Sequence, residues 1–154
     1  MNIFFLDKDP KKCAEYHCDK HVVKMILETA KLLCSAHWMT GSEAQYKLSH
    51  KNHPCSIWVR ESLSNYLYLC EIGLELCKEY THRYGKKHKS QEIIEWCIIN
   101  KINILDKGIT KIPKAMPDHY KVECPIQSYR NYYIGDKSNF TTWKKREIPF
   151  WFYK

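Results

Sequence analysis

Residues 9–36, DPKKCAEYHCDKHVVKMILETAKLLCSA, decide the fold of this 154-residue chain. Asp9 is a favourable N-cap and Pro10 suits a first helical turn, so a helix is predicted to start here. Apolar residues then recur at helical spacing, which predicts one long helix near residues 10–37 with one buried face. That face consists of Val22, Met25, Ile26, Ala30, Leu32, Leu33 and Ala36.

A second row of side chains runs beside this apolar face. Its members are spaced by four, three, four and three residues, so they lie in one line along a helix. We call this row the polar stripe, and it consists of His17, His21, Lys24, Glu28 and Lys31. Partial burial shifts the pKa values of such groups and favours acid–base chemistry. The alternative is a solvated helix face with two incidental histidines.

The rest of the chain predicts a mainly α protein with a single domain over residues 1–154. MNIFFLD, residues 1–7, is either a short strand or an extended segment packed against the core. Pro54 starts a second long helix, over residues 54–84, which Gly85 ends. A third helix, over residues 90–102, is apolar nearly all round, which predicts that it is buried.

The C-terminal third carries fewer helical signals. Residues 103–124 contain a glycine and two prolines and predict a loop. Pro125 starts a short helix that Gly135 ends, and a basic, aromatic tail follows from Ser138. We therefore expect a compact single-domain helical bundle, with a short extended N-terminal segment and an aromatic, basic C-terminal tail.

Composition narrows the class of protein. The net charge of +8 and the pI near 9.0 favour a polyanionic partner, most simply nucleic acid. The chain has no apolar run long enough to cross a membrane and no secretory signal, so an intracellular, non-secreted protein is expected. None of its 8 cysteines forms a CxxC pair, which favours cysteines that act as small hydrophobic residues.

Two further patterns have chemical content. Cys13, His17 and His21 are spaced by four residues and could share a zinc ion, but no second paired-ligand motif completes the set, so we expect no metal and no cofactor. His50 and His53 flank the predicted N-terminus of the second long helix, where free N–H groups suit a phosphate. The alternative is that His53 only caps that helix.

Aromatic and basic residues also alternate toward the C-terminus. Aromatic rings stack on unpaired bases while cations hold phosphates, so this pattern is typical of nucleic-acid binding. The alternative is that most of these aromatic residues pack in the core. The predicted nucleic-acid contacts are His50, His53, Arg60, Lys86, Lys87, Lys89, Arg130, Tyr132, Tyr133, Lys137, Trp143, Lys144, Lys145 and Arg146.

Several segments together resemble a family of small proteins from phages and large DNA viruses. They are CDKHVVKMILETAKLL, HKNHP, KEYTHRYGKKH, KAMPDHYK and YRNYYIGDKSNFTTWK. The chain also resembles pyrimidine-dimer DNA glycosylases of the endonuclease V type, which are basic, mainly helical single-domain proteins. Ala14 and His17 match the AxxH pattern of their first helix, and residues 129–137 are similar to their YxYYGK motif.

The sequence departs from those glycosylases at two catalytic positions. Their nucleophile is the α-amine exposed when Met1 is removed, and the size of Asn2 disfavours that removal here. Their catalytic glutamate falls near Lys24, and the nearest carboxylate on the polar stripe is Glu28, one turn further on. Of the catalytic groups, only His17 carries over directly.

These observations lead to one hypothesis and two alternatives. The hypothesis is a DNA N-glycosylase, with or without AP-lyase activity, acting on damaged or modified bases in duplex DNA. Glu28 supplies the carboxylate, Lys24 or the Met1 α-amine is the nucleophile, and His17 and His21 contact phosphate or move protons. The alternatives are a non-catalytic nucleic-acid-binding protein and a nucleotide-directed enzyme with a phosphate site at Pro54.

Overall fold

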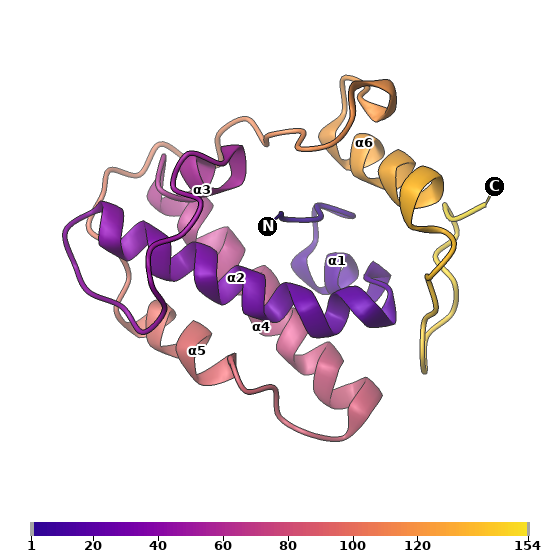
Figure 1. The fold of residues 1–154 in the computed structure, drawn as a ribbon, viewed down its shortest axis with the longest axis horizontal. Helices are drawn as coiled ribbons and strands as arrows, with labels where there is room; N and C mark the ends of the chain where they lie inside the picture. The colour runs from indigo at the N-terminus through magenta and orange to yellow at the C-terminus, as the bar shows by residue number, and fades with distance from the viewer. Residues whose placement is uncertain (1, 154) are drawn as a thin grey trace.

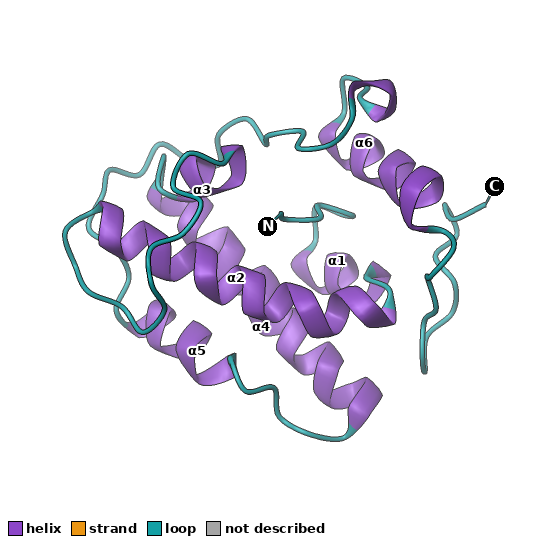
Figure 2. Cartoon of the chain, in the orientation of Figure 1, coloured by secondary structure: helices purple, strands orange, loops and turns teal. Residues whose placement is uncertain are grey.

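The computed structural model describes residues 2–153, and every regular element in that range is a helix (Figure 1, Figure 2). The mainly α prediction is therefore confirmed. The elements are α1 (Pro10–Tyr16), α2 (Asp19–Met39), α3 (Pro54–Val59), α4 (Leu63–Tyr84), α5 (Gln91–Ile99), the 3₁₀ turn η1 (Asp118–Tyr120), α6 (Pro125–Tyr132) and the π-helical turn η2 (Tyr133–Lys137).

The first predicted helix is two helices, because the chain turns at His17 and Cys18. His17 has extended backbone angles, with φ −64° and ψ 134°, and Cys18 is the N-cap of α2. Distant residues bind the backbone groups freed by this break. Arg83 donates to the His17 carbonyl oxygen at 2.8 Å, and the Asp19 N–H donates to the Thr142 carbonyl at 2.8 Å. The prediction of a single helix over residues 10–37 is therefore wrong.

The second long helix is also interrupted, between α3 and α4. The Leu63 N–H donates to the Leu105 carbonyl at 3.1 Å, and the Ser62 hydroxyl donates to Asp106 at 3.2 Å. The loop after α5 thus supplies partners to the start of α4. The predicted end of α4 is confirmed, because Gly85 adopts the left-handed φ of 69° that favours glycine at a helix C-terminus.

Helices α2 and α4 form the centre of the molecule, with α1 and α5 packed beside them (Figure 1). The apolar face predicted for α2 is buried, and each of its valine, leucine, isoleucine and methionine side chains contributes about 1.5–3 kcal/mol of transfer free energy. The N-terminal segment Ile3–Leu6 is buried without strand pairing and packs against this core. Of the two conformations left open for it, the packed extended segment is the one observed.

Two predictions for the later elements are wrong. Helix α5 buries Ile94 and Cys97 but leaves Ile99 82% exposed, because only one face packs against α2 and α4. Gly135 does not end the last helix, since α6 continues into η2 through that position. A Cβ atom at Gly135 would collide with the Tyr120 ring, so close packing explains this glycine.

Two further features of the fold concern membrane-spanning helices and the cysteines. None of the helices within residues 2–153 is long and apolar enough to cross a membrane. All the cysteines are free thiols, and every one except Cys124 is buried. The seven buried cysteines therefore pack as small hydrophobic side chains, as their sequence context predicts.

Candidate active site

Four members of the polar stripe lie on α2, and His17 lies just before it at the α1 C-cap. The spacing of three, four and three residues places the four on one helix face. They differ in exposure, because His21 is buried, Lys24 is exposed, and Glu28 and Lys31 are half-buried. Solvent therefore reaches two amines and one carboxylate on this face.

Both histidines are held neutral by burial. The His17 Nδ1 is hydrogen-bonded to the Cys13 carbonyl oxygen at 2.7 Å, and burial lowers the His17 pKa to about 4. The His21 Nδ1 is 2.6 Å from the Tyr133 hydroxyl, and its ring stacks on Phe4 with centroids 4.5 Å apart. Burial, and then nearby positive charges, lower the His21 pKa to about 3. Rings enclosed in this way do not contact a phosphate.

The exposed part of the stripe borders a cavity of about 270 Å³. Glu28 and Lys31 form one wall, and the segment between α2 and α3 forms the other. Among the described residues, neither Glu28 nor Lys31 makes an ion pair within 4.0 Å. The remaining lining residues are Tyr46, Lys47, Ser49 and His50.

The N-terminal segment packs against the His21 end of the polar stripe. Figure 1 shows the N-terminal segment between α2, α3 and α6. Asn2 donates to the Ala115 carbonyl oxygen at 2.9 Å and accepts from the Cys55 thiol at 3.3 Å. Phe4, two residues later, stacks on His21 of the stripe. Met1, named above as a source of the α-amine, lies outside the described residues.

His50 lines the cavity beside Glu28, but His53 and Arg60 do not. His53 caps α3, because its Nδ1 accepts from the Cys55 N–H at 3.0 Å. Burial lowers the His53 pKa, in keeping with a neutral ring. Arg60 lies at the end of α3, near the Ser56 hydroxyl. Because His53 already caps α3 and the helix is only six residues long, we expect its N-terminus at Pro54 to bind a phosphate poorly.

A family model for pyrimidine dimer DNA glycosylases matches residues 1–92. The chain belongs to the pyrimidine dimer DNA glycosylase family. A search of curated proteins and a search of solved structures each gave no match.

The glycosylase family match covers the part of the chain that forms the polar stripe and its cavity. It includes the N-terminal segment, α1 to α4 and the loop before α5. Helix α6 and the tail lie beyond it. The family match therefore covers the helix that carries Lys24 and Glu28.

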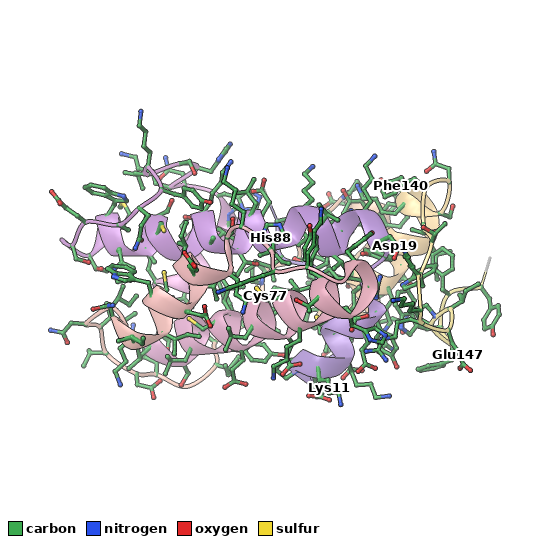
Figure 3. All side chains as sticks on the ribbon, turned by 90° about the horizontal axis from the view of Figure 1, so that it is seen from below. Lys11, Asp19, Cys77, His88, Phe140 and Glu147 are labelled. Carbon is green, nitrogen blue, oxygen red and sulfur yellow. The ribbon has the colours of Figure 1, made fainter. Side chains whose placement is uncertain are left out.

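The basic tract at residues 86–89 folds back onto the same helix as the stripe. The His88 Nε2 is 3.1 Å from the carbonyl oxygen of Val23, the residue before Lys24. Figure 3 labels His88 beside α2. Lys87 is 3.7 Å from Glu92, so part of its charge is neutralised. Lys86 and Lys89 are exposed and make no ion pair within the described chain.

The predicted nucleic-acid contacts in the C-terminal region divide into two groups. Tyr133 and Trp143 are buried in the core, and neither ring is accessible to a base. Arg130 donates to the Leu6 carbonyl oxygen at 2.9 Å and pairs with Asp7, so its guanidinium holds the N-terminal segment. The second group is accessible in part or in full, and none of its three lysines makes an ion pair among the described residues; it consists of Tyr132, Lys137, Lys144 and Lys145.

Arg146, the last of these predicted contacts, belongs to a buried charge network. Its guanidinium makes two 2.9 Å hydrogen bonds to Glu79, which also accepts from fully buried Arg83 at 2.7 Å. Burial alone would raise the Glu79 pKa, but the hydrogen bonds from Arg146 and Arg83 outweigh it and lower that pKa. Arg83 also binds Asp19 at 3.0 Å, so α1, α2, α4 and the tail meet here.

Sequence reasoning missed this network. The only local signal is the spacing of four residues between Glu79 and Arg83, which is common on solvated helix faces. Its other members are more than sixty residues away in sequence. Figure 3 shows Asp19 at the end of the molecule where the tail lies.

The suggested zinc ligands do not form a metal site. Within residues 2–153, no three histidine, cysteine, aspartate or glutamate side chains group as metal ligands. The break after Tyr16 is the reason, because it removes the helical spacing between Cys13 and His21. The Cys13 thiol donates instead to the Phe4 carbonyl oxygen at 3.2 Å.

Proposed function

We propose that this protein is a DNA N-glycosylase that releases a damaged or modified base from duplex DNA. The observation that carries the proposal is the family match over the segment that contains the polar stripe. The net charge of +8 supports a polyanionic substrate, and the exposed lysines 20, 24, 86 and 89 provide cations near α2.

The proposed reaction begins with extrusion of the target base, which costs a few kcal/mol and is easiest for a damaged or mispaired base. The glycosidic bond then breaks, and its electron pair leaves with the base, which takes up a proton. Glu28 stabilises the positive charge that develops on the sugar. Its position supports this role, since it borders a cavity and no described cation within 4.0 Å neutralises it.

An amine is proposed to add to the sugar C1′ and lose a proton. The C1′–O4′ bond then opens, its electron pair stays on O4′, which takes up a proton, and an imine results. The two candidates are the Lys24 side chain and the α-amine of the chain. An α-amine has an ordinary pKa near 7.7–8.0 against about 10.4 for lysine, so its free-base fraction at neutral pH is several hundred times larger. We therefore favour the α-amine. Elimination of the 3′-phosphate from the imine would then give strand cleavage.

A turnover screen tests the proposal. Duplexes that each carry one damaged or modified base are incubated with the full chain, and free nucleotides are assayed in parallel. Base release from at least one duplex, with no reaction of free nucleotides, is expected. Binding that weakens steeply with salt but gives no base release would support a non-catalytic binding protein instead, because each phosphate contact releases counterions.

Borohydride trapping tests the imine. Reduction during turnover should give a stable protein–DNA adduct, and mass spectrometry of its peptides should place the link at the N-terminal peptide. A link at Lys24 would assign the nucleophile to the stripe. Base release without an adduct would indicate that water attacks the sugar, and the AP-lyase part of the proposal would then be wrong.

A further inference from the structure

Helix α2 ends in a turn that places a serine hydroxyl against a histidine ring. Thr40 is the C-cap, and Gly41 adopts a left-handed φ of 88°. The Ser42 N–H then donates to the His37 carbonyl oxygen at 3.0 Å, which forms a Schellman motif. An apolar contact often accompanies this motif. Here the contact is polar, because the Ser42 hydroxyl lies 2.8 Å from the His37 Nδ1.

The opposite edge of the His37 ring fixes its tautomer. The His37 Nε2 is 2.9 Å from the Tyr66 hydroxyl, which donates its own proton to the Cys97 carbonyl oxygen at 2.7 Å. The Nε2 atom therefore carries the hydrogen and donates to Tyr66, so Nδ1 keeps its lone pair and accepts from Ser42. The other contact of the Ser42 hydroxyl, with the His37 carbonyl oxygen, is 3.5 Å long and much weaker.

Burial keeps His37 neutral while the serine stays open to solvent. His37 is 2% exposed, its ring packs on Trp96 with centroids 5.0 Å apart, and burial lowers its pKa. Ser42, in contrast, is exposed. An accessible hydroxyl bonded to a neutral imidazole, which a third group orients from its other nitrogen, is the arrangement of an activated serine nucleophile.

His37 and Ser42 both line a cavity of about 330 Å³, which shares no lining residue with the cavity beside Glu28. Its other lining residues come from the end of α2 and from α5 and the segment after it, and they are Thr40, Glu43, Trp96, Asn100, Lys101, Ile102 and Asn103. The part from residue 96 onward lies beyond the glycosylase family match.

Two groups beside this cavity suit a developing negative charge. The N–H of Glu43, the residue after the serine, has no carbonyl partner among residues 2–153. Lys101 makes no ion pair within the same range. A free backbone N–H next to the nucleophile and a nearby cation are the kinds of group that stabilise an oxyanion.

We propose that Ser42 is the nucleophile of a second site, which hydrolyses small uncharged acyl esters. The Ser42 oxygen bonds to the ester carbonyl carbon while its proton passes to the His37 Nδ1, and the carbonyl electron pair moves onto its oxygen. The bond to the alcohol then breaks, and the alcohol leaves with the electron pair and takes the proton from His37. Water repeats both steps, which releases the acid and restores the serine. Tyr66 is a positioning residue that holds the ring.

The size and charge of the cavity define this substrate class. Its 330 Å³ is about eleven times the volume of a water molecule in the liquid, which suits a short acyl group. Glu43 and Lys101 carry opposite charges, so the cavity does not select a charged substrate. Trp96 and Ile102 provide apolar contact for the acyl chain.

Labelling with an alkyl fluorophosphonate, which reacts with activated serines, tests the nucleophile. The full chain is treated with the reagent and digested, and the modified peptide is identified by mass spectrometry. We expect the label at Ser42. Ser42→Ala should abolish labelling, and Ser138→Ala, in the tail and outside the cavity, should leave it unchanged. No label, or a label that persists in Ser42→Ala, would overturn the inference.

Turnover of p-nitrophenyl acetate tests the histidine. His37→Gln should slow hydrolysis about 10²-fold or more, because the general base is lost. Since replacement of a buried ring also threatens folding, Tyr66→Phe is the second variant. It keeps the aromatic ring but removes the acceptor for the His37 Nε2, so kcat should fall about tenfold with KM unchanged. Wild-type kcat in Tyr66→Phe, or a loss confined to KM, would contradict the proposed role of His37.

These measurements are independent of the proposed glycosylase. Neither involves DNA, so their results stand whether or not base release is found. On any duplex from which the wild type releases a base, Ser42→Ala should release it at the wild-type rate, because the two cavities share no lining residue. Slower base release by Ser42→Ala would contradict a separate site.

Discussion

At the scale of single residues, burial separates the members of the polar stripe into two kinds. His17 and His21 have their Nδ1 atoms bound inside the protein and remain neutral at pH 7. Lys24, Glu28 and Lys31 reach solvent. The histidines therefore hold α1, α2 and the Phe4 segment in position, and the chemistry that we propose falls to the other three.

The buried histidines should make the protein less stable in mild acid. Their folded pKa values of about 4 and about 3 lie below the ordinary 6.5, so the unfolded chain takes up their protons first. Stability is complete above pH 6.5 and falls as the pH decreases below it. Between pH 7.5 and pH 5.0 each histidine should cost about 2 kcal/mol of unfolding free energy, measured by urea denaturation.

Replacement of one histidine isolates its share of this loss. His21→Gln should reduce the difference in unfolding free energy between the two pH values by about 2 kcal/mol. Exposed His119→Gln is the control and should leave the difference unchanged. If the His21→Gln protein lost as much stability as the wild type between pH 7.5 and pH 5.0, burial of a neutral His21 would be contradicted.

At the scale of elements, the sequence predicted where helices occur better than where they stop. The N-cap at Asp9, the proline at position 10 and the C-terminal Gly85 are local signals, and all three were located correctly. The breaks after Tyr16 and Val59 carry no local glycine or proline signal. Long-range hydrogen bonds stabilise them, donated by Arg83 at the first break and accepted by the carbonyl oxygens of Thr142 and Leu105, and helical periodicity continues across both breaks.

Arg83 should therefore be essential for stability. Arg83→Met removes the donor to Glu79, Asp19 and the His17 carbonyl and leaves a buried carboxylate with fewer partners. Breaking a buried ion pair in this way costs about 3–5 kcal/mol, to be measured by urea denaturation. Exposed Lys78→Met on the same helix is the control. A loss below about 1 kcal/mol would show that the network is not needed to hold the break.

Gly73 lies where α4 packs tightly against α2 and α5. A Cβ atom there would lie 2.9 Å from the Thr29 Cγ2 and 3.2 Å from the Ile94 Cδ1. Gly73→Val should therefore cost about 1–3 kcal/mol of unfolding free energy through overpacking. Glu71→Val, at an exposed position of α4, controls for the helix propensity of valine. Thr29→Ser should recover part of the stability lost in Gly73→Ala, and purely additive effects would contradict this contact.

At the scale of the whole molecule, α2 and the loop before α3 line the cavity beside Glu28, while the N-terminal segment and the tail pack nearer the start of α2, at His21 and Asp19. The sequence identified Lys24, Glu28 and His50 as candidates because helical spacing and charge are local properties. It could not show that Trp143 and Tyr133 are buried or that Arg146 binds Glu79, since burial depends on contacts between distant segments. For the same reason the cavity beside Glu28 became apparent only in three dimensions.

The central claim is that Glu28 assists cleavage of a glycosidic bond, and Glu28→Gln tests it most directly. This change keeps the size of the side chain and removes its charge. Under single-turnover conditions on the duplex found in the screen, we predict that base release slows about 10²–10³-fold while duplex binding is retained. Glu43→Gln, exposed in the loop after α2, should react at the wild-type rate. Base release by the Glu28→Gln protein at nearly the wild-type rate would contradict the account.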